Sequence, residues 1–363
     1  MKTSIYIFFF LLSNLIIWAQ TSPSSLSPQQ STVNESINPT NTTQKTTVER
    51  GNDASNFEQL FLQTNQYFHQ QKHLKALLSG NQALAIAEKE KNIKNQIKIN
   101  GLLGNIYESV SMYHKTREHV NKAEELIASG PLPEDMRYIE GNVYYLKAMN
   151  FAHTLDLEMA LGYFDKAIAI FSSTHHSFSG INLQLSYLNK GFAYLELNKL
   201  EEATILFEKM KEKRIEESTT NLPPSVLLNL DLFILFAEAK KNTIQNKPTQ
   251  SIGILNHIST LDKETLLLSN QEDFYLLYVR NFLNLHQIDS VKKYNALYNQ
   301  EVAKGQLKQQ DIFQSIIATE SKKQQEIIVK LKSKNTVLLL FSSLIFIGGL
   351  LLSYFLYFRK KIT

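Results

Sequence analysis

The sequence predicts an all-α fold: a solenoid of helical hairpins, followed by a long helix and one C-terminal transmembrane helix. From Phe57 to residue 300 the chain has few Gly and Pro residues, and apolar residues recur at three- and four-residue spacings, as in amphipathic helices. The same order of small and aromatic residues returns along this region, which indicates a repeat. Near the end, the 22 residues from Val337 to Phe358 carry no charge, enough to cross about 30 Å of hydrocarbon.

The beginning of the chain has the pattern of an export signal. Residues 1–19 combine Lys2, a long apolar run and the small residue Ala19, which is typical of a signal peptide. If it stayed uncleaved as a short anchor, the following residues would still cross the membrane. Residues 20–56 are rich in Ser, Thr, Asn, Gln and Pro and predict a disordered tether. The alternative is a glycosylated or partner-binding segment.

The end of the chain predicts a single membrane pass. Residues 301–335 predict a juxtamembrane helix with a weak coiled-coil seam, which leads into a transmembrane helix at 336–358 and a cytoplasmic tail at 359–363. Lysines and arginines flank both sides of the span, so the positive-inside rule gives no orientation. The signal peptide does, and it places the bulk of the chain on the periplasmic side of the inner membrane. A buried hairpin helix is the alternative to the span.

Two weak patterns favour a homodimer through the juxtamembrane and transmembrane helices. Phe313, Ile317 and Leu331 fall on one heptad seam, although polar residues interrupt it. In the span, Gly349 and Ser353 have the small-xxx-small spacing that lets two membrane helices approach closely. A monomer or a complex with another chain is the alternative.

Composition excludes several classes of function. Lys2 and the three basic residues of the tail account for four of the 38 Lys and Arg residues, which leaves 34 basic against 34 acidic residues in between. A nucleic-acid binder usually has a clustered basic surplus, so no nucleic-acid partner is expected. The chain has no cysteine, which rules out a disulfide, a thiol nucleophile and a lipid-modified N-terminal cysteine.

Two segments show the repeat most clearly. Small residues stand at relative positions 8 and 20 and aromatic residues at 11 and 24 of each unit. The members are Ala148, Phe151, Ala160, Phe164 and Ala167 in one unit, and Gly191, Tyr194, Ala203, Phe207 and Met210 in the next. Small residues let two helices approach closely, and the large ones fill the space beside them.

This frame resembles the tetratricopeptide repeat (TPR), a pair of antiparallel helices. Four more units fit it less closely, with Gly80 and Thr116 at positions that usually hold another residue type, and the segment around Ser251 fits poorly, with a possible insertion near Lys247 and Pro248. Six pairs within 57–300 imply a spacing near 40 residues, with helix breaks at the proline-containing segments 129–135 and 221–225. An irregular helical bundle is the alternative.

No catalytic, cofactor or metal site is expected. His69 and His73 lie four residues apart, but a turn between two helices explains them better than zinc does. His175 and His176 belong to a loop-like stretch. Acid pairs such as Glu124 with Glu125 have the spacing of solvated charges on outer helix faces.

The TPR resemblance implies a binding groove lined by the first helix of each pair at relative positions 2, 5, 9 and 12. The resulting groove residues are Asn65, Phe68, Asn105, Glu108, Tyr145, Met149, Phe192 and Arg280, with Phe61, Leu188, Leu195 and Leu276 at equivalent positions. Packing between neighbouring pairs is an equal explanation for Phe61, Leu188 and Leu195. The carboxylate clamp of chaperone-binding TPR proteins is unsupported, because Phe61 stands where that clamp has lysine.

The order of segments is similar to the sensory half of bacterial TPR membrane regulators, whose output domain follows the span. Here only five residues follow it. The resemblance therefore implies a membrane-anchored, exported, non-enzymatic scaffold for a protein or peptide partner. The alternatives are a sensory subunit that signals through another membrane protein, and, less favoured, a hydrolase or metal enzyme on a helical scaffold.

Overall fold

The computed structural model describes residues 45–130, 132–174, 179–217, 224–261, 271–307, 309–318 and a few positions up to 332. The predicted signal peptide, span and tail lie outside these residues. Among the helices that are described, none is both long and apolar enough to serve as a membrane span. The described residues up to 309 belong to one compact unit, and those from 310 onward belong to a second.

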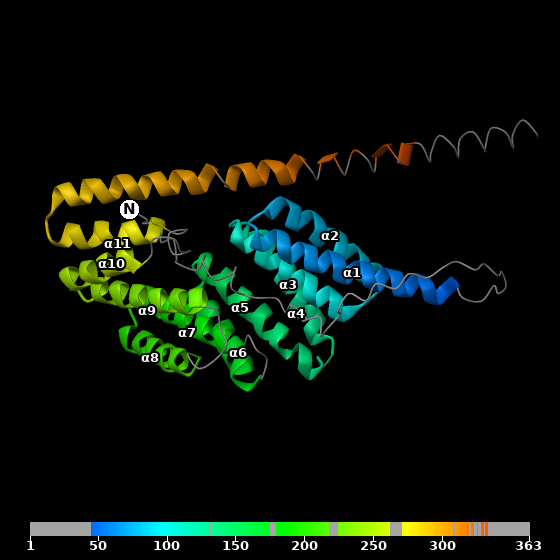
Figure 1. Cartoon of the computed structure of the whole chain (residues 1–363), viewed down its shortest axis with the longest axis horizontal. Helices are drawn as coiled ribbons and strands as arrows, with labels where there is room; N and C mark the ends of the chain where they lie inside the picture. The colour runs from blue at the N-terminus through cyan, green and yellow to red at the C-terminus, as the bar shows by residue number, and fades with distance from the viewer. Residues whose placement is uncertain are drawn as a thin grey trace, which may run out of the picture. The chain divides into compact units, whose positions relative to one another are not determined.

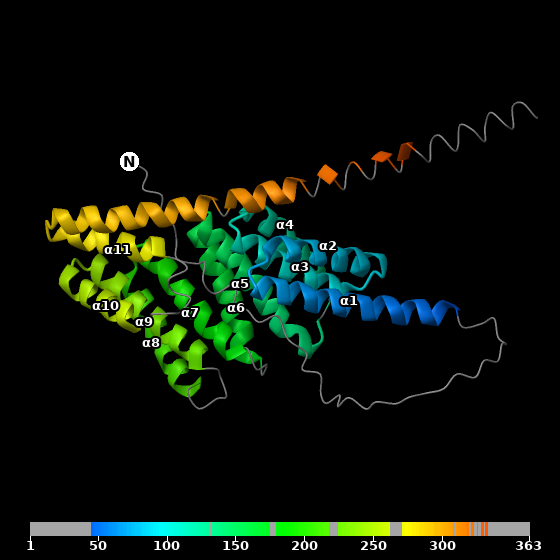
Figure 2. The ribbon, with the colours of Figure 1, turned by 45° about the horizontal axis from the view of Figure 1, so that its top comes forward.

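The first unit is a series of helical hairpins, and each hairpin packs against the next (Figures 1 and 2). The helices are α1 (Lys45–His69), α2 (His73–Lys89), α3 (Ile93–Ser109), α4 (Tyr113–Ala128), α5 (Arg137–His153), α6 (Leu157–Ser173), α7 (Ser179–Glu196), α8 (Leu200–Glu217), α9 (Pro224–Ile244), α10 (Pro248–Leu261) and α11 (Gln271–Asn284). A short 3-10 turn, Glu134–Met136, precedes α5. Residues 288–307 are helical and complete the sixth pair with α11.

The same turn closes each of the six pairs. Its central residue takes a left-handed conformation with φ between 55° and 63°, and these residues are Gln71, Ser111, Leu155, Asn198, Asn246 and His286. The amide of the following residue donates a hydrogen bond to the carbonyl five residues before it, at 2.8–3.0 Å. This left-handed C-cap ends the first helix of each pair and starts the chain back. The turns recur every 40 to 48 residues, which confirms the repeat and its long spacing.

Small side chains lie where the two helices of a pair meet. Position 20 is fully buried in five pairs, by Ala76, Thr116, Ala160, Ala203 and Ser251. Gly80 stands where an aromatic residue was expected. The neighbouring second pair accounts for the absence of a side chain at this position. A Cβ at Gly80 would lie 2.7 Å from Leu103 Cδ2, so the Leu103 side chain occupies the space that the aromatic ring would fill.

The structure differs from the expected boundaries in two places. Helix α1 begins at Lys45, inside the predicted tether. The nearest preceding proline is Pro39, so nothing in the backbone chemistry stops the packed helix from extending back to Lys45. The fifth pair has no insertion at Lys247, because Lys247 N donates to the Asn242 carbonyl in the usual turn, and Pro248 is the first residue of α10.

The two histidines that could have held a metal flank the first turn. His69 is the last residue of α1 and His73 the first of α2, which confirms the turn. His73 Nδ1 lies 3.4 Å from Ser109 Oγ, and its ring meets that of Phe68 edge-on. Burial lowers the pKa of His69. His175 and His176 lie outside the described residues.

Candidate binding site

Most of the predicted groove residues fill interfaces between hairpins. Side chains at seven of the eight positions are buried: Asn65, Phe68, Asn105, Glu108, Tyr145, Met149 and Phe192. Only Arg280 is exposed. The first helices of successive pairs contact one another, α1 with α3, α3 with α5, α5 with α7 and α7 with α9. Positions 5, 9 and 12 therefore pack between helices, and these seven residues do not line an open groove.

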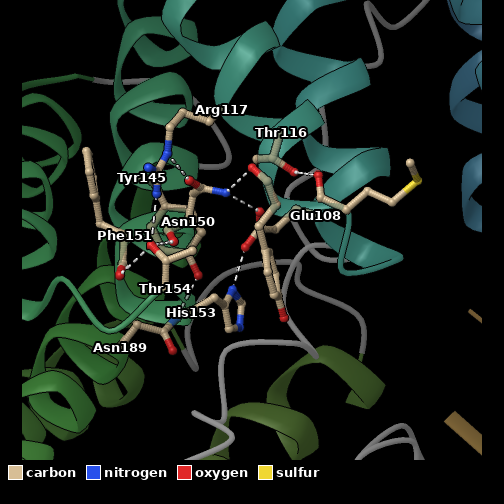
Figure 3. A network of polar contacts seen from close by, with 11 residues as sticks. Glu108, Thr116, Arg117, Tyr145, Asn150, Phe151, His153, Thr154 and Asn189 are labelled. Carbon is tan, nitrogen blue, oxygen red and sulfur yellow. Dashed lines mark hydrogen bonds and ion pairs between the residues drawn. The ribbon is translucent and has the colours of Figure 1, made fainter. Parts of the chain in front are cut away.

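A buried polar network joins the second and third pairs, and Glu108 lies at its centre (Figure 3). The Glu108 carboxylate is bound by Asn150 Nδ2 at 3.2 Å and by His153 Nδ1. Asn150 Nδ2 also donates to the carbonyl of Tyr113 at 2.8 Å. The ring of Tyr113 stacks on His153 with centroids 5.0 Å apart. The turn of the second pair is thereby fixed to the last turn of α5.

Arg117 closes the other side of this network (Figure 3). Its Nε donates to Asn150 Oδ1 at 3.0 Å, and its Nη2 donates to Thr154 Oγ1 at 2.8 Å. The guanidinium lies 4.9 Å from the centroid of the Phe151 ring. Because each of these polar groups has a partner from the chain itself, the network stabilises the hairpin junction and offers no ligand site.

Tyr145 makes a second link, from α5 to α7. Its hydroxyl accepts a hydrogen bond from Asn189 Nδ2 at 2.6 Å, and burial raises the pKa of the phenol. Like Glu108, this predicted groove residue holds two pairs together.

The first helices of the last three pairs leave a pocket open. Its lining combines charged and apolar side chains from α7, α9 and α11: Glu196, Phe236, Lys240, Asp273, Leu276, Leu277 and Arg280. The pocket is a small depression that is open to solvent. Arg280 and Leu276 were predicted groove positions, so this is where the structure brings predicted residues to an accessible surface.

One ion pair lies inside the pocket and is satisfied by the chain. Lys240 Nζ donates to Glu196 Oε1 at 2.6 Å, and both side chains are nearly buried. The Lys240 ammonium also lies 5.4 Å from the centroid of the Phe192 ring. The charges of Lys240 and Glu196 therefore balance each other.

Asp273 is the unusual group of the pocket. Its pKa is raised to about 7, chiefly by burial; Lys240 and Arg280 oppose the rise, and the carboxylates of Glu272 and Glu196 add to it. No described residue donates a hydrogen bond to Asp273 or pairs with it. At neutral pH its carboxyl is therefore poised between charged and neutral forms.

Sequence reasoning missed Asp273, Lys240 and Glu196. Lys240 and Asp273 stand at positions 9 and 2 of their units, which are groove positions, so the repeat frame could have found them. The fifth unit fits the frame poorly, because Asn242 and Leu255 replace the expected aromatic residues, and no groove positions were assigned in it. Glu196 lies one position beyond the groove set. Among the described residues, no group of three or more His, Asp or Glu side chains could hold a metal ion.

Comparison with known proteins supports the fold. No protein-family model matches the chain, and no characterised protein matches it in sequence. Among solved structures, the apo form of RapI has a TM-score of 0.50 at 14% identity, covering 71% of this chain and 93% of RapI. PilF of Pseudomonas aeruginosa has a TM-score of 0.43 at 13% identity, covering 73% of this chain and 99% of PilF. Aspartyl phosphate phosphatase F from Bacillus subtilis has a TM-score of 0.46 at 15% identity, covering 68% and 64% of the two chains.

These are TPR-type helical repeat proteins. The likeness to RapI, together with the six equivalent turns, shows that the fold of this chain is TPR-like.

Proposed function

We propose that the protein is an exported, membrane-anchored scaffold that binds a protein or peptide partner and catalyses no reaction. The observation that carries the proposal is the mixed polar and apolar pocket on the first helices of the last three pairs, within a TPR-like array. Helical repeat arrays use the surfaces of stacked units to bind other proteins. The polar groups of the Glu108 network are bound by other residues of the chain. The pocket lined by α7, α9 and α11 is therefore the proposed binding surface.

Two sequence patterns support the proposed location. The apolar run 337–358 carries no charge, and residues 1–19 have the pattern of a signal peptide. A reporter that is active only in the cytoplasm should work when fused after Thr363, and one that requires export should work at Gly51. The reverse result would contradict the proposed orientation.

Partner binding is tested by co-purification of the full chain from its native membranes. The wild type should retain a partner that Leu276→Arg loses, because that change places a bulky charged side chain on the half-buried apolar part of the pocket lining. Lys122→Glu, on the exposed face of α4, is the control and should retain the partner. Equal recovery from both variants would contradict binding at the pocket.

A sensory subunit is the second candidate function. The helical residues before the predicted span and the basic tail favour it, because they could connect an exported partner to another membrane protein. A cytoplasmic kinase or regulator among the co-purified proteins would support this function, whereas exported partners alone support the scaffold.

Self-association is a further part of the proposal. Phe313 and Ile317, on the predicted heptad seam, are about half exposed, as an interface with a second copy requires. A cysteine at seam position Leu331 should crosslink in membranes more efficiently than one at off-seam Val329. Equal crosslinking would contradict pairing along the seam.

A further inference from the structure

We infer that the pocket lined by α7, α9 and α11 receives a lysine or arginine side chain of the bound partner, with Asp273 as its counter-ion. This inference rests on the proposed function, since it names the chemistry of the partner at the same site. It is carried by the arrangement of charges and apolar groups in the pocket.

Asp273 supplies an acceptor with no partner from the described chain. It belongs to the first turn of α11, is half-buried, and forms part of the pocket lining. A desolvated carboxylate without a hydrogen-bond donor is costly, and a ligand that brings a cation removes that cost. A ligand cation would therefore bind at a carboxylate to which no described residue donates a hydrogen bond.

The nearby cations Lys240 and Arg280 fill this role only in part, and Lys240 has the larger effect on the Asp273 carboxyl. Lys240 is held by Glu196 at 2.6 Å, and both are largely withdrawn from solvent. Arg280 lies seven residues from Asp273 on the same helix and is exposed, with no ion pair to it within 4 Å. Solvent screens an exposed guanidinium, so it compensates the Asp273 carboxylate only in part.

The remaining charges favour a cation over an anion. Lys240 and Arg280 lower the pKa of Asp273, and Glu272 and Glu196 raise it, so with Asp273 itself three acidic groups stand against two basic ones. The carboxylate of a bound acidic ligand would meet both Asp273 and Glu272 and would be repelled. Glu301, on the helical run 288–307, adds further negative potential at Glu272.

The apolar part of the lining suits the stem of a long basic side chain. Phe236 and Leu277 are buried beside the charged groups, and Leu276 is half-buried. Lysine and arginine bury their methylene groups on such surfaces while their charged heads reach a polar group. A small inorganic cation would leave this apolar surface unused.

The test is selection of binding peptides from a random display library by the full chain in detergent micelles. Peptides enriched by the wild type should share a lysine or arginine at one fixed position. Asp273→Asn should lose that preference, because the amide keeps the shape and removes the charge. Arg280→Gln, at the rim, should keep it.

The outcomes separate this inference from the proposed function. Enriched peptides with no fixed basic residue, or with an acidic residue or free carboxyl terminus that Arg280→Gln abolishes, would overturn the inference and leave the scaffold function standing. If the wild type enriched no peptide, the proposed function and the inference would both be overturned.

A pH series on one selected peptide gives a second readout. The Asp273 carboxyl, with its pKa near 7, is mostly ionised at pH 8 and mostly protonated at pH 6, whereas a lysine stays charged at both. Glu196, Lys240, Glu272 and Arg280 face it from α7, α9 and α11. Fluorescence anisotropy should show binding about tenfold weaker at pH 6 than at pH 8, and Asp273→Asn should remove this dependence. Equal pH dependence in that variant would overturn the role of Asp273.

Discussion

Two junctions between hairpins differ in how their charged side chains are paired. One lies between the second and third pairs, and the other lies among the last three pairs. Both place charged side chains near the ends of first helices, at Glu108 and at Glu196. At the first junction, Asn150 and His153 bind the Glu108 carboxylate, and Arg117 completes the network. At the second, Glu196 is paired with Lys240, but Asp273 beside them has no partner among the described residues.

The difference separates stability from function in a repeat array. Where every polar group is bound by the chain, the junction acts as a rigid packing interface. Where one polar group beside apolar side chains has no hydrogen-bond donor from the chain, a partner can supply that contact, and the contact contributes to the free energy of binding. Equivalent repeat positions therefore do not predict equivalent roles.

The largest expected effect comes from opening the closed junction. Glu108→Ala leaves His153 Nδ1 without the Glu108 carboxylate and removes one of the two acceptors of Asn150 Nδ2. It should lower the free energy of unfolding by about 3 kcal/mol, the upper range for a buried donor that loses its acceptor. Urea unfolding measures it. Glu118→Ala, which removes an exposed carboxylate from the neighbouring helix, should cost little, and equal losses would contradict the special role of the network.

The packing of the two helices within a pair comes next. Ala160→Leu places a large side chain at a fully buried small position and should cost about 1–3 kcal/mol by overpacking. Ala203→Leu should behave alike, because both residues occupy position 20. The same change at exposed Glu202 should be near neutral. Thermal unfolding that fails to separate Ala203→Leu from Glu202→Leu would contradict the repeat register.

A smaller effect is expected from the open junction, and its sign depends on pH. The folded pKa of Asp273 lies above its ordinary value, so the folded state is penalised once the carboxyl must ionise, as pH rises from about 4 through 7. Asp273→Asn should therefore become more stable relative to the wild type over that range, by on the order of 1 kcal/mol after screening at the pocket mouth. Urea unfolding at pH 4 and pH 8 checks this. A difference that shrinks toward pH 8 would show that Asp273 is not strained.

The smallest expected changes in stability come from substitutions of two helical glycines. One glycine lies at an open position and the other at a crowded one. A Cβ at Gly162 meets nothing within 4 Å, so Gly162→Ala should stabilise the fold by about 0.5–1 kcal/mol through chain entropy and helix propensity. A Cβ at Gly191 would lie 2.4 Å from Phe207 Cε1, so Gly191→Ala should destabilise it. Melting temperatures that shift in the same direction for both would contradict the packing of α7 on α8.

The sequence predicted the repeat well because its signals are local. Small residues at positions 8 and 20 and the break at 129–135 are visible within one unit, and the structure places Ala160 and Ala203 in the core as the frame requires. The fifth pair was underestimated because Asn242 and Leu255 replace aromatic residues, although the backbone turn at Asn246 is the same.

The site was predicted less well because its contacts are not local. Glu108 and His153 are 45 residues apart, so their pairing has no signal within one unit. The frame placed Glu108 in a groove because it ignores how closely the first helices of successive pairs approach. Similarly, the unusual state of Asp273 depends on three helices, α7, α9 and α11, and on burial that composition does not report.

The central claim is that the open junction, and not the closed one, meets the partner. Site-specific photo-crosslinking of the full chain in its native membranes tests it most directly, with a photoreactive phenylalanine at Arg280 in one variant and at exposed Lys122 of α4 in another. The account predicts a discrete crosslinked protein at Arg280 and none at Lys122. Crosslinks of equal yield at both positions, or at Lys122 alone, would contradict it.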